Sequence, residues 1–183
     1  VTVSRVEATV TYPANFQLVA AMNPCPCGHF PDLARCRCTE GQITRYLQKI
    51  SGPLLDRIDL CVEASPVTYG DVRGGGENEA SGAIRARVEQ AREIQKERFM
   101  EENIRCNGEM SGRHIRKYCV LGKEEETFME EVFEKLALSA RMHDRILKVA
   151  RTTADLAGES KIRLSDLCEA VSYVKSREKF WGN

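Results

Sequence analysis

Hydrophobic and polar positions divide the chain into a first part rich in β-forming residues and a second part with helical periodicity. At the start, residues 1–5 and 9–12 are two short runs of β-forming side chains, joined near residues 6–8. Two such runs with a short connection are typical of a β-hairpin. We therefore expect the chain to open with a hairpin.

Two later apolar runs predict further strands. Residues 16–22 (FQLVAAM) form a continuous apolar run bounded by Pro13 and Pro24. A short run of this kind is typical of a strand that is buried on both faces, as in a parallel sheet. Residues 58–63 (IDLCVE) predict another strand. The first part of the chain is therefore expected to belong to an α/β fold.

Helix signals lie between and after these runs. Thr39 and Gln42 have the spacing of a capping box, and they precede an apolar helical face formed by Ile43, Tyr46, Leu47 and Ile50. Pro53 suits the first turn of a short helix that runs to about Arg57. Residues 66–79 contain several glycines and predict a linker, and beyond them apolar residues recur at helical spacing.

Capping residues divide this helical part into separate helices. A long helix is expected to reach about Glu102, and Ser111, Ser139 and Ser165 are each expected to cap a later helix. Gly158 is expected to end the helix that Ser139 begins, because glycine readily adopts the left-handed conformation found at helix ends. The second part of the chain is therefore expected to be all helical.

The composition fits a folded protein without a membrane span. The 183 residues include 27 basic and 27 acidic side chains, with 42% hydrophobic and 30% charged residues. This balance excludes binding of nucleic acid by a strongly basic domain, although a basic loop or hairpin could still bind it. No apolar run approaches the ~20 residues of a membrane span. We expect a cytoplasmic protein, and, because Val1 already lies within the first β-forming run, a piece of a longer one.

The eight cysteines are unevenly distributed. Four of them fall within fourteen positions, with the spacing C-x-C-x8-C-x-C: Cys25, Cys27, Cys36 and Cys38. Four thiolates in so short a loop can close a tetrahedral structural zinc site. Common zinc ribbons use C-x2-C pairs, so the alternative is four reduced thiols in a loop rich in proline and glycine. The scatter of the other cysteines argues against a secreted disulfide scaffold.

Three polar residues lie where a phosphate site could use them, and each also has a plainer interpretation. Asn23 directly follows the apolar run, where α/β sheets place ligands, or it is a turn residue before a proline. Arg57 could stabilise a transferring phosphoryl group, or it pairs with a neighbouring aspartate. Arg141 begins a basic helix that would suit an anion, or that helix has a solvated basic face with partners such as Asp155.

Six strings of residues, taken in order, carry a resemblance to a known family. They are residues 3–5 (VSR), 12–14 (YPA), 18–28 (LVAAMNPCPCG), 51–60 (SGPLLDRIDL), 138–145 (LSARMHDR) and 150–158 (ARTTADLAG). These strings resemble the magnesium-chelatase-like AAA+ ATPases, and the ComM/YifB branch in particular, over essentially the whole chain. The resemblance implies an ATPase that works as a ring, usually a homo-hexamer, and whose ComM members remodel DNA by branch migration.

The resemblance also implies roles for individual residues. It makes Asn23 the sensor 1 residue, which positions the attacking water, and Arg57 the arginine finger, which acts on ATP bound by the neighbouring subunit. It makes Arg141 the sensor 2 arginine, which reaches the γ-phosphate from a helical lid. Residues 1–12 resemble a hairpin that points toward the pore in related rings. Arg5 near its tip is then a candidate DNA contact, or simply an exposed arginine.

The chain departs from the family pattern in one large respect. It contains no G-x-x-x-x-G-K-[ST] string and no apolar run ending in Asp-Glu, the motifs that hold phosphate and Mg²⁺. We therefore expect the C-terminal part of an ATPase: an α/β fragment in residues 1–66, a linker in 67–79 and an all-α lid domain in 80–183. ATP and Mg²⁺ would then be cofactors of the intact protein, which includes a missing N-terminal part, and this chain alone should be inactive.

Two other functions stay open at this point. The chain could be a stand-alone, zinc-stabilised module that binds a protein or a nucleic acid. It could also be the ATPase subunit of a true magnesium chelatase, an alternative that the cysteine cluster disfavours by resemblance only.

Overall fold

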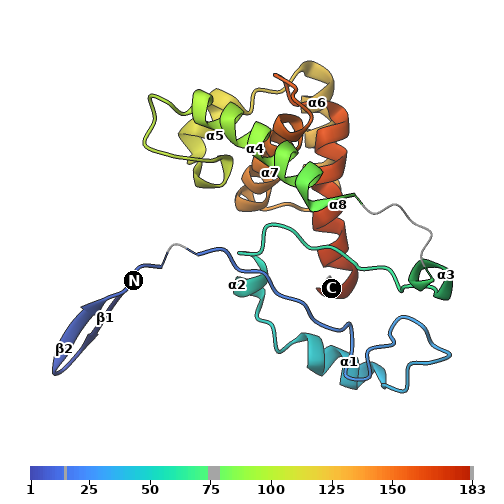
Figure 1. Cartoon of the computed structure of the whole chain (residues 1–183). Helices are drawn as coiled ribbons and strands as arrows, with labels where there is room; N and C mark the ends of the chain where they lie inside the picture. The colour runs from blue at the N-terminus through green and yellow to red at the C-terminus, as the bar shows by residue number, and fades with distance from the viewer. Residues whose placement is uncertain (15, 74–78, 182–183) are drawn as a thin grey trace. The chain divides into compact units, whose positions relative to one another are not determined.

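The structure is a computed structural model that describes residues 1–14, 16–73 and 79–181. The chain forms two compact units, Val1–Lys49 and Ile50–Asn183, which are described one after the other. Figure 1 shows a short β-hairpin and one helix in the first unit and a group of packed helices in the second. This order agrees with the expected α/β fragment followed by a helical region.

The hairpin predicted at the start of the chain is confirmed. Strands β1 (Thr2–Arg5) and β2 (Ala8–Thr11) pair antiparallel, with Arg5 opposite Ala8 beside the turn. Side chains alternate between the two faces of a strand. One face therefore carries two pairs of hydroxyl groups, Thr2 with Thr11 at 3.1 Å and Ser4 with Thr9 at 2.8 Å. Every residue of both strands is exposed.

The strand predicted for residues 16–22 is wrong for this structure. These residues lie outside any sheet and are exposed, with Phe16 and Val19 exposed by 77% and 85%. A strand buried on both faces needs neighbouring strands for its backbone groups and helices for its side chains. The described residues supply neither, so the apolar run stays unpaired.

The capping box at Thr39 is confirmed. Helix α1 (Glu40–Leu47) begins after Thr39, whose Oγ1 accepts from the backbone N–H of Gln42 at 3.3 Å. The backbone N–H of Thr39 donates in return to Oε1 of Gln42 at 2.9 Å. These two bonds satisfy backbone donors that a helix start leaves unpaired. Helix α1 buries Leu47 and ends the first unit.

The second unit opens with the predicted short helix. Helix α2 (Gly52–Leu55) has Pro53 in its first turn and buries Leu55. Residues 58–63 continue without strand pairing, so the second predicted strand is also wrong here, for the same lack of neighbours. Helix α3 (Tyr69–Val72) is a single turn within the predicted linker. Gly74, Gly75 and Gly76 lie outside the described residues.

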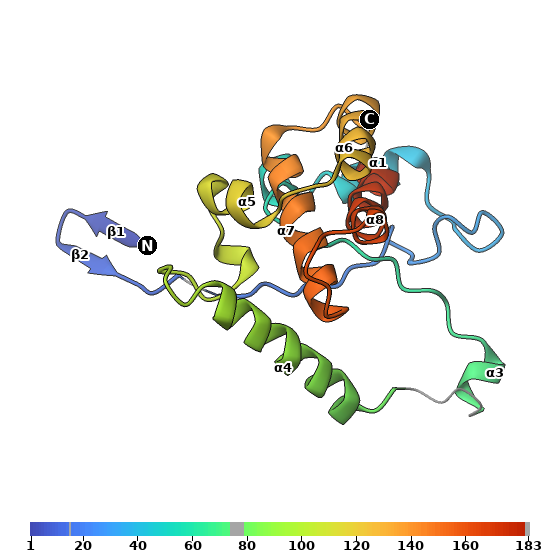
Figure 2. The same ribbon diagram turned by 90° about the horizontal axis from the view of Figure 1, so that it is seen from above.

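Helices then follow to the end of the described chain. They are α4 (Ser81–Arg98), the 3₁₀ turn η1 (Asn107–Glu109), α5 (Gly112–Tyr118), α6 (Lys123–Lys135), α7 (Ala140–Leu156) and α8 (Leu164–Trp181). Helix α7 is central, because it packs against α4, η1, α5 and α8 (Figure 2). The shared core includes Phe99, Met129, Ile146, Ala150, Leu167 and Val171.

Two of the predicted caps of α7 and α8 are confirmed and one is wrong. Ser139 precedes α7, and its Oγ accepts from the backbone N–H of Met142 at 3.3 Å. Gly158 follows that helix with φ of +72°, the conformation in which glycine avoids the steric cost of a side chain. Ser165 is not a cap, because α8 already begins at Leu164. The carboxylate of Asp166 accepts the backbone N–H of Arg163 instead, at 2.8 Å.

Among the described residues, no helix is both long enough and apolar enough to cross a membrane.

Candidate metal centre and predicted nucleotide-site residues

The four clustered cysteines come together in the first unit. The sulfur atoms of Cys25, Cys27, Cys36 and Cys38 all lie within 4.8 Å of one another. The Sγ of Cys25 lies 3.4 Å from that of Cys27 and 3.8 Å from that of Cys36, and Cys27 and Cys36 are 3.6 Å apart. A tetrahedral zinc site with Zn–S near ~2.3 Å needs sulfur atoms about 3.8 Å apart. The cluster therefore has the donor set and the spacing of a structural zinc site.

Backbone N–H groups in the same loop stabilise charge on the sulfurs. The N–H of Phe30 donates to Sγ of Cys25 at 3.4 Å. The N–H groups of His29 and Arg37 lower the pKa of Cys27 to about 6, whereas burial raises the pKa of Cys38 to about 12. The thiolate is the form that binds a metal. The pKa of Cys25 is lowered too, because hydrogen bonds to its sulfur outweigh its burial. The loop thus favours a thiolate at two ligand positions, and a bound cation would be needed to ionise all four.

Asn23 lies at the edge of this cysteine loop. Its side chain is exposed and sits against Gly28, where an added β-carbon would lie 3.5 Å from Nδ2 of Asn23. Gly28 has φ of +81° and closes the turn by donating its N–H to the carbonyl of Cys25 at 3.0 Å. The conformation of the loop therefore affects the position of the Asn23 amide.

Arg57 and Arg141, the two other predicted nucleotide-site residues, belong to the second unit. Arg57 is exposed just after α2, and its Nη1 donates to the carbonyl of Pro53 at 2.5 Å. The predicted alternative, an ion pair with a neighbouring aspartate, does not form. Arg141 is the second residue of α7 and is also exposed. Both guanidinium groups are therefore accessible, as groups that meet a nucleotide must be.

Arg5, the candidate nucleic-acid contact, ends β1 and is exposed beside the hairpin turn. Its position opposite Ala8 places it on the face that does not carry the hydroxyl pairs.

Sequence reasoning missed the ion pairs that connect residues 56–63 with helices α7 and α8. Arg145 pairs with Asp59, its Nε lying 2.8 Å from Oδ1. Arg177 pairs with Asp56 at 3.1 Å, and Lys179 pairs with Glu63 at 2.6 Å. The signal available in the sequence was the presence of three acidic residues, Asp56, Asp59 and Glu63, in an otherwise mostly apolar stretch. The cationic partners could not be chosen because they lie far away in the chain, 121 residues from Asp56 to Arg177 and 116 residues from Glu63 to Lys179.

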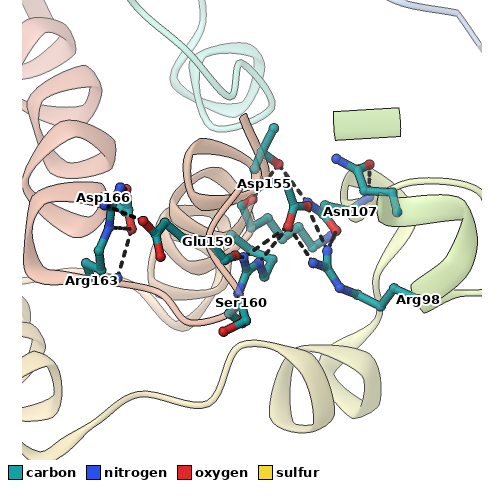
Figure 3. A network of polar contacts seen from close by, with 11 residues as sticks. Arg98, Asn107, Asp155, Glu159, Ser160, Arg163 and Asp166 are labelled. Atoms are coloured by element: carbon teal, nitrogen blue, oxygen red, sulfur yellow. Dashed lines mark hydrogen bonds and ion pairs between the residues drawn. The ribbon is translucent and has the colours of Figure 1, made fainter. Parts of the chain in front are cut away.

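A second missed feature is the buried polar network shown in Figure 3. The carboxylate of Asp155 accepts from Nη1 of Arg98 at 2.7 Å, from Nδ2 of Asn107 at 2.8 Å and from Nε of Arg151 at 3.0 Å. Arg151 also donates to the backbone carbonyls of Glu159 and Ser160. Arg151 is only 2% exposed, so the expected solvated basic face of this helix is wrong at that position. The network joins α4, η1 and α7.

The comparisons with known proteins agree with the resemblance noted above. Residues 1–72 match the family model described as magnesium chelatase, subunit ChlI, and residues 78–174 match the one described as magnesium chelatase, subunit ChlI C-terminal. The chain belongs to the magnesium chelatase ChlI family.

Relatives within this family point to one branch of it. The chain is 42% identical over 172 residues to the competence protein ComM of Haemophilus influenzae, and 43% identical over 171 residues to YifB of Salmonella typhimurium and of Escherichia coli. Each match covers 93% of this chain and 33% of the relative. These identities are consistent with the ComM/YifB branch, and the chain spans about a third of the length of these relatives.

Proposed function

We propose that this chain is the sensor and lid part of a magnesium-chelatase-like AAA+ ATPase, which in a longer cytoplasmic protein couples ATP hydrolysis to remodelling of DNA. The protein would work as a homo-hexameric ring, with residues 1–66 in the α/β core, 67–79 as a linker and 80–183 as the lid. Support comes from the two family models, which end at residue 72 and begin at residue 78, both within the predicted linker.

The observation that carries this proposal is the presentation of Arg57. Its guanidinium group is exposed, while the residues before and after it are held by ion pairs to the helices. A cation fixed at its base and exposed at its tip suits charge stabilisation on a phosphoryl group that a neighbouring subunit holds. Arg141, exposed in the first turn of α7, would supply a positive charge at the nucleotide that its own subunit binds, and Asn23 an amide that orients water.

ATP with Mg²⁺ would supply the anhydride bond that is hydrolysed. This chain offers Asn23, Arg57 and Arg141 toward that group, but its sequence has no phosphate-binding loop and no Asp-Glu motif to grip the phosphates and the metal. Each of these residues would act at an ATP site whose phosphate-binding and metal-binding groups come from another part of the protein.

Substitution of Arg57 in the longer protein tests the proposal. Arg57→Ala should leave ATP binding nearly unchanged and reduce the rate of hydrolysis by roughly 10³-fold or more, the usual effect of losing an arginine finger. Arg45→Ala, which removes another exposed arginine from α1, is the matched control and should hydrolyse ATP normally. Normal turnover by Arg57→Ala would refute the assignment.

The hairpin is the part of the chain that we propose to contact DNA. It is exposed on all sides and carries Arg5 beside its tip. A DNA contact by one exposed arginine is compatible with a chain of zero net charge, because it does not depend on the field of the whole protein.

The cysteine cluster favours one further assignment, a structural zinc ion. A chain purified without chelator should contain about one equivalent of zinc, and Cys27→Ser with Cys38→Ser should lose it. If the isolated chain also binds DNA tightly without any other part of the protein, the stand-alone zinc module becomes the better description.

A further inference from the structure

Two arginines of the helical region hold the acidic residues on either side of Arg57. Nε of Arg145, on α7, lies 2.8 Å from Oδ1 of Asp59, and Nη2 of Arg145 donates to the backbone carbonyl of Asp56. Nη1 of Arg177, on α8, lies 3.1 Å from Oδ1 of Asp56. The backbone that precedes Arg57 and the side chain two residues after it are thus attached to the same helix.

The two arginines of these ion pairs are largely buried, whereas their partners Asp59 and Asp56 are 72% and 59% exposed. The side chains of Arg145 and Arg177 are only 13% and 19% exposed, and Leu55, just before the attached residues, is buried. Arg57 makes its hydrogen bond to the carbonyl of Pro53 in α2, and not to α7 or α8. The segment is therefore fixed to α7 and α8 at its flanks, while its one outward guanidinium group remains at the surface.

The position of Arg145 on α7 connects this attachment with Arg141, the predicted nucleotide contact on the same helix. Arg141 and Arg145 are four residues apart, which places them on the same side of the helix, one turn from each other. One turn of an α-helix is a rise of about 5.4 Å. A rigid displacement of the first turns of α7 would therefore move Arg141 and the attachment point of residues 56–59 together.

We propose that Arg145 is a positioning residue that transmits the nucleotide state sensed at Arg141 to Arg57, and so connects two successive ATP sites of the ring. This inference rests on the proposed function, in which Arg141 meets the subunit's own nucleotide and Arg57 meets that of its neighbour. Arg145 touches neither nucleotide. It acts by holding the carbonyl of Asp56 and the carboxylate of Asp59 against α7.

A first experiment tests the attachment in this chain without any ATPase assay. Trypsin cleaves after Arg57, and release of the segment from α7 should speed that cleavage about three- to fivefold in Arg145→Ala, the range expected for a partly exposed ion pair. Asp59→Ala should have a similar effect. Lys148→Ala is the matched control, because Lys148 lies on the same helix but donates to the carbonyl of Gly108, at 3.1 Å. Unchanged cleavage in Arg145→Ala would overturn the attachment.

A second experiment tests the transmission in the longer protein. Arg145→Ala should lower kcat about ten- to a hundredfold with unchanged affinity for ATP, because a displaced catalytic group loses rate more than binding. Arg145→Lys should recover part of the rate, since it keeps a cation for Asp59. In an Arg57→Lys background, adding Arg145→Ala should cause little further loss, because both changes act through the same group.

The outcomes separate this inference from the proposed function. A wild-type kcat for Arg145→Ala, or an undiminished further loss in the Arg57→Lys background, would overturn the transmission and leave the arginine finger in place. Normal turnover by Arg57→Ala would instead refute the finger, whatever Arg145 does.

Discussion

The two compact units of this chain differ in what holds them together. In Ile50–Asn183 the helices bury a shared core in which Ala150 and Leu167 are fully inaccessible. Among the described residues of Val1–Lys49, only Cys25 and Leu47 are buried. The second unit is therefore stabilised by apolar burial, whereas the first depends on hairpin hydrogen bonds and on the cysteine loop.

This difference reflects the range of the interactions that each kind of element needs. An α-helix satisfies its own backbone groups, so α7 needs only other helices of the same unit to cover its apolar side. A strand takes its backbone partners from other segments. Residues 16–22 therefore remain exposed, and we expect strands of the longer protein to cover them. The comparison predicts that the two units respond differently to the same treatment.

The largest predicted effect is the removal of metal from the cysteine loop. A chelator, or Cys27→Ser, should abolish protection from hydrogen exchange in residues 25–38 and leave the helical unit unchanged. Structural zinc contributes about 10–16 kcal/mol of binding free energy in small zinc-finger peptides. Here a bound metal would stabilise a unit that has almost no apolar core. Hydrogen exchange followed by mass spectrometry measures both regions at once.

Cys168→Ser is the control for that experiment, because Cys168 is exposed on α8 and far from the cluster in sequence. It should change neither the metal content nor the exchange. Equal protection of residues 25–38 with and without metal would show that the first unit is stable without a metal ion. That result would contradict the proposed difference in what stabilises the two units.

The next effect concerns the helical unit alone. Asp155→Ala should destabilise it by about 3–5 kcal/mol, because the change leaves Arg98 and Arg151 as buried cations without their carboxylate. Urea unfolding followed by circular dichroism measures the loss. Asp144→Ala, on the same helix but partly exposed, should cost less than about 0.5 kcal/mol. An equal, small effect of both variants would show that the network of Figure 3 contributes little to stability.

The smallest predicted effect is a pH dependence at Glu102. Hydrogen bonds from Lys117 at 2.8 Å and Tyr118 at 3.1 Å, with the charge of Arg113, lower the pKa of Glu102 to about 2. The unfolded chain has the ordinary pKa near 4.5. The contribution of Glu102 is therefore complete above about pH 5 and is lost as the pH falls from there toward 2.

Comparing wild type with Glu102→Gln isolates the contribution of the Glu102 carboxylate to the free energy of unfolding. The difference in unfolding free energy should be constant between pH 6 and pH 8, shrink below pH 5 and approach zero near pH 2. A difference that does not change with pH would mean that the carboxylate of Glu102 is not held by its cationic neighbours.

Local signals in the sequence were sufficient for the elements that depend on nearby residues. The hairpin, the capping box of Thr39 and Gln42, and the two ends of α7 at Ser139 and Gly158 were all predicted, because each involves residues within a few positions of one another. The strand at residues 16–22 was predicted from its composition and did not form, since its partners are not among the described residues.

The candidate sites likewise divide into features set by nearby residues, which could be predicted, and features set by distant residues, which could not. The cysteine cluster could be predicted because its ligands share one loop. The exposure of Arg57 and Arg141 agrees with their predicted roles but does not test them. The attachment of Asp59 to Arg145 and the burial of Arg151 could not be foreseen, because charge alone does not tell which of 27 basic residues a given acidic one will meet.

The pair of Arg98 and Asp155 has a consequence for the kinetics of folding. Its members are 57 residues apart in the chain, so α4 can join α7 only after a long loop has closed. Contacts of this separation usually form late, after the more local packing of α7 with α8. Weakening the pair should then accelerate unfolding more than it slows folding, so the lifetime of the folded helical unit would depend on a bond that contributes little to the speed of its formation.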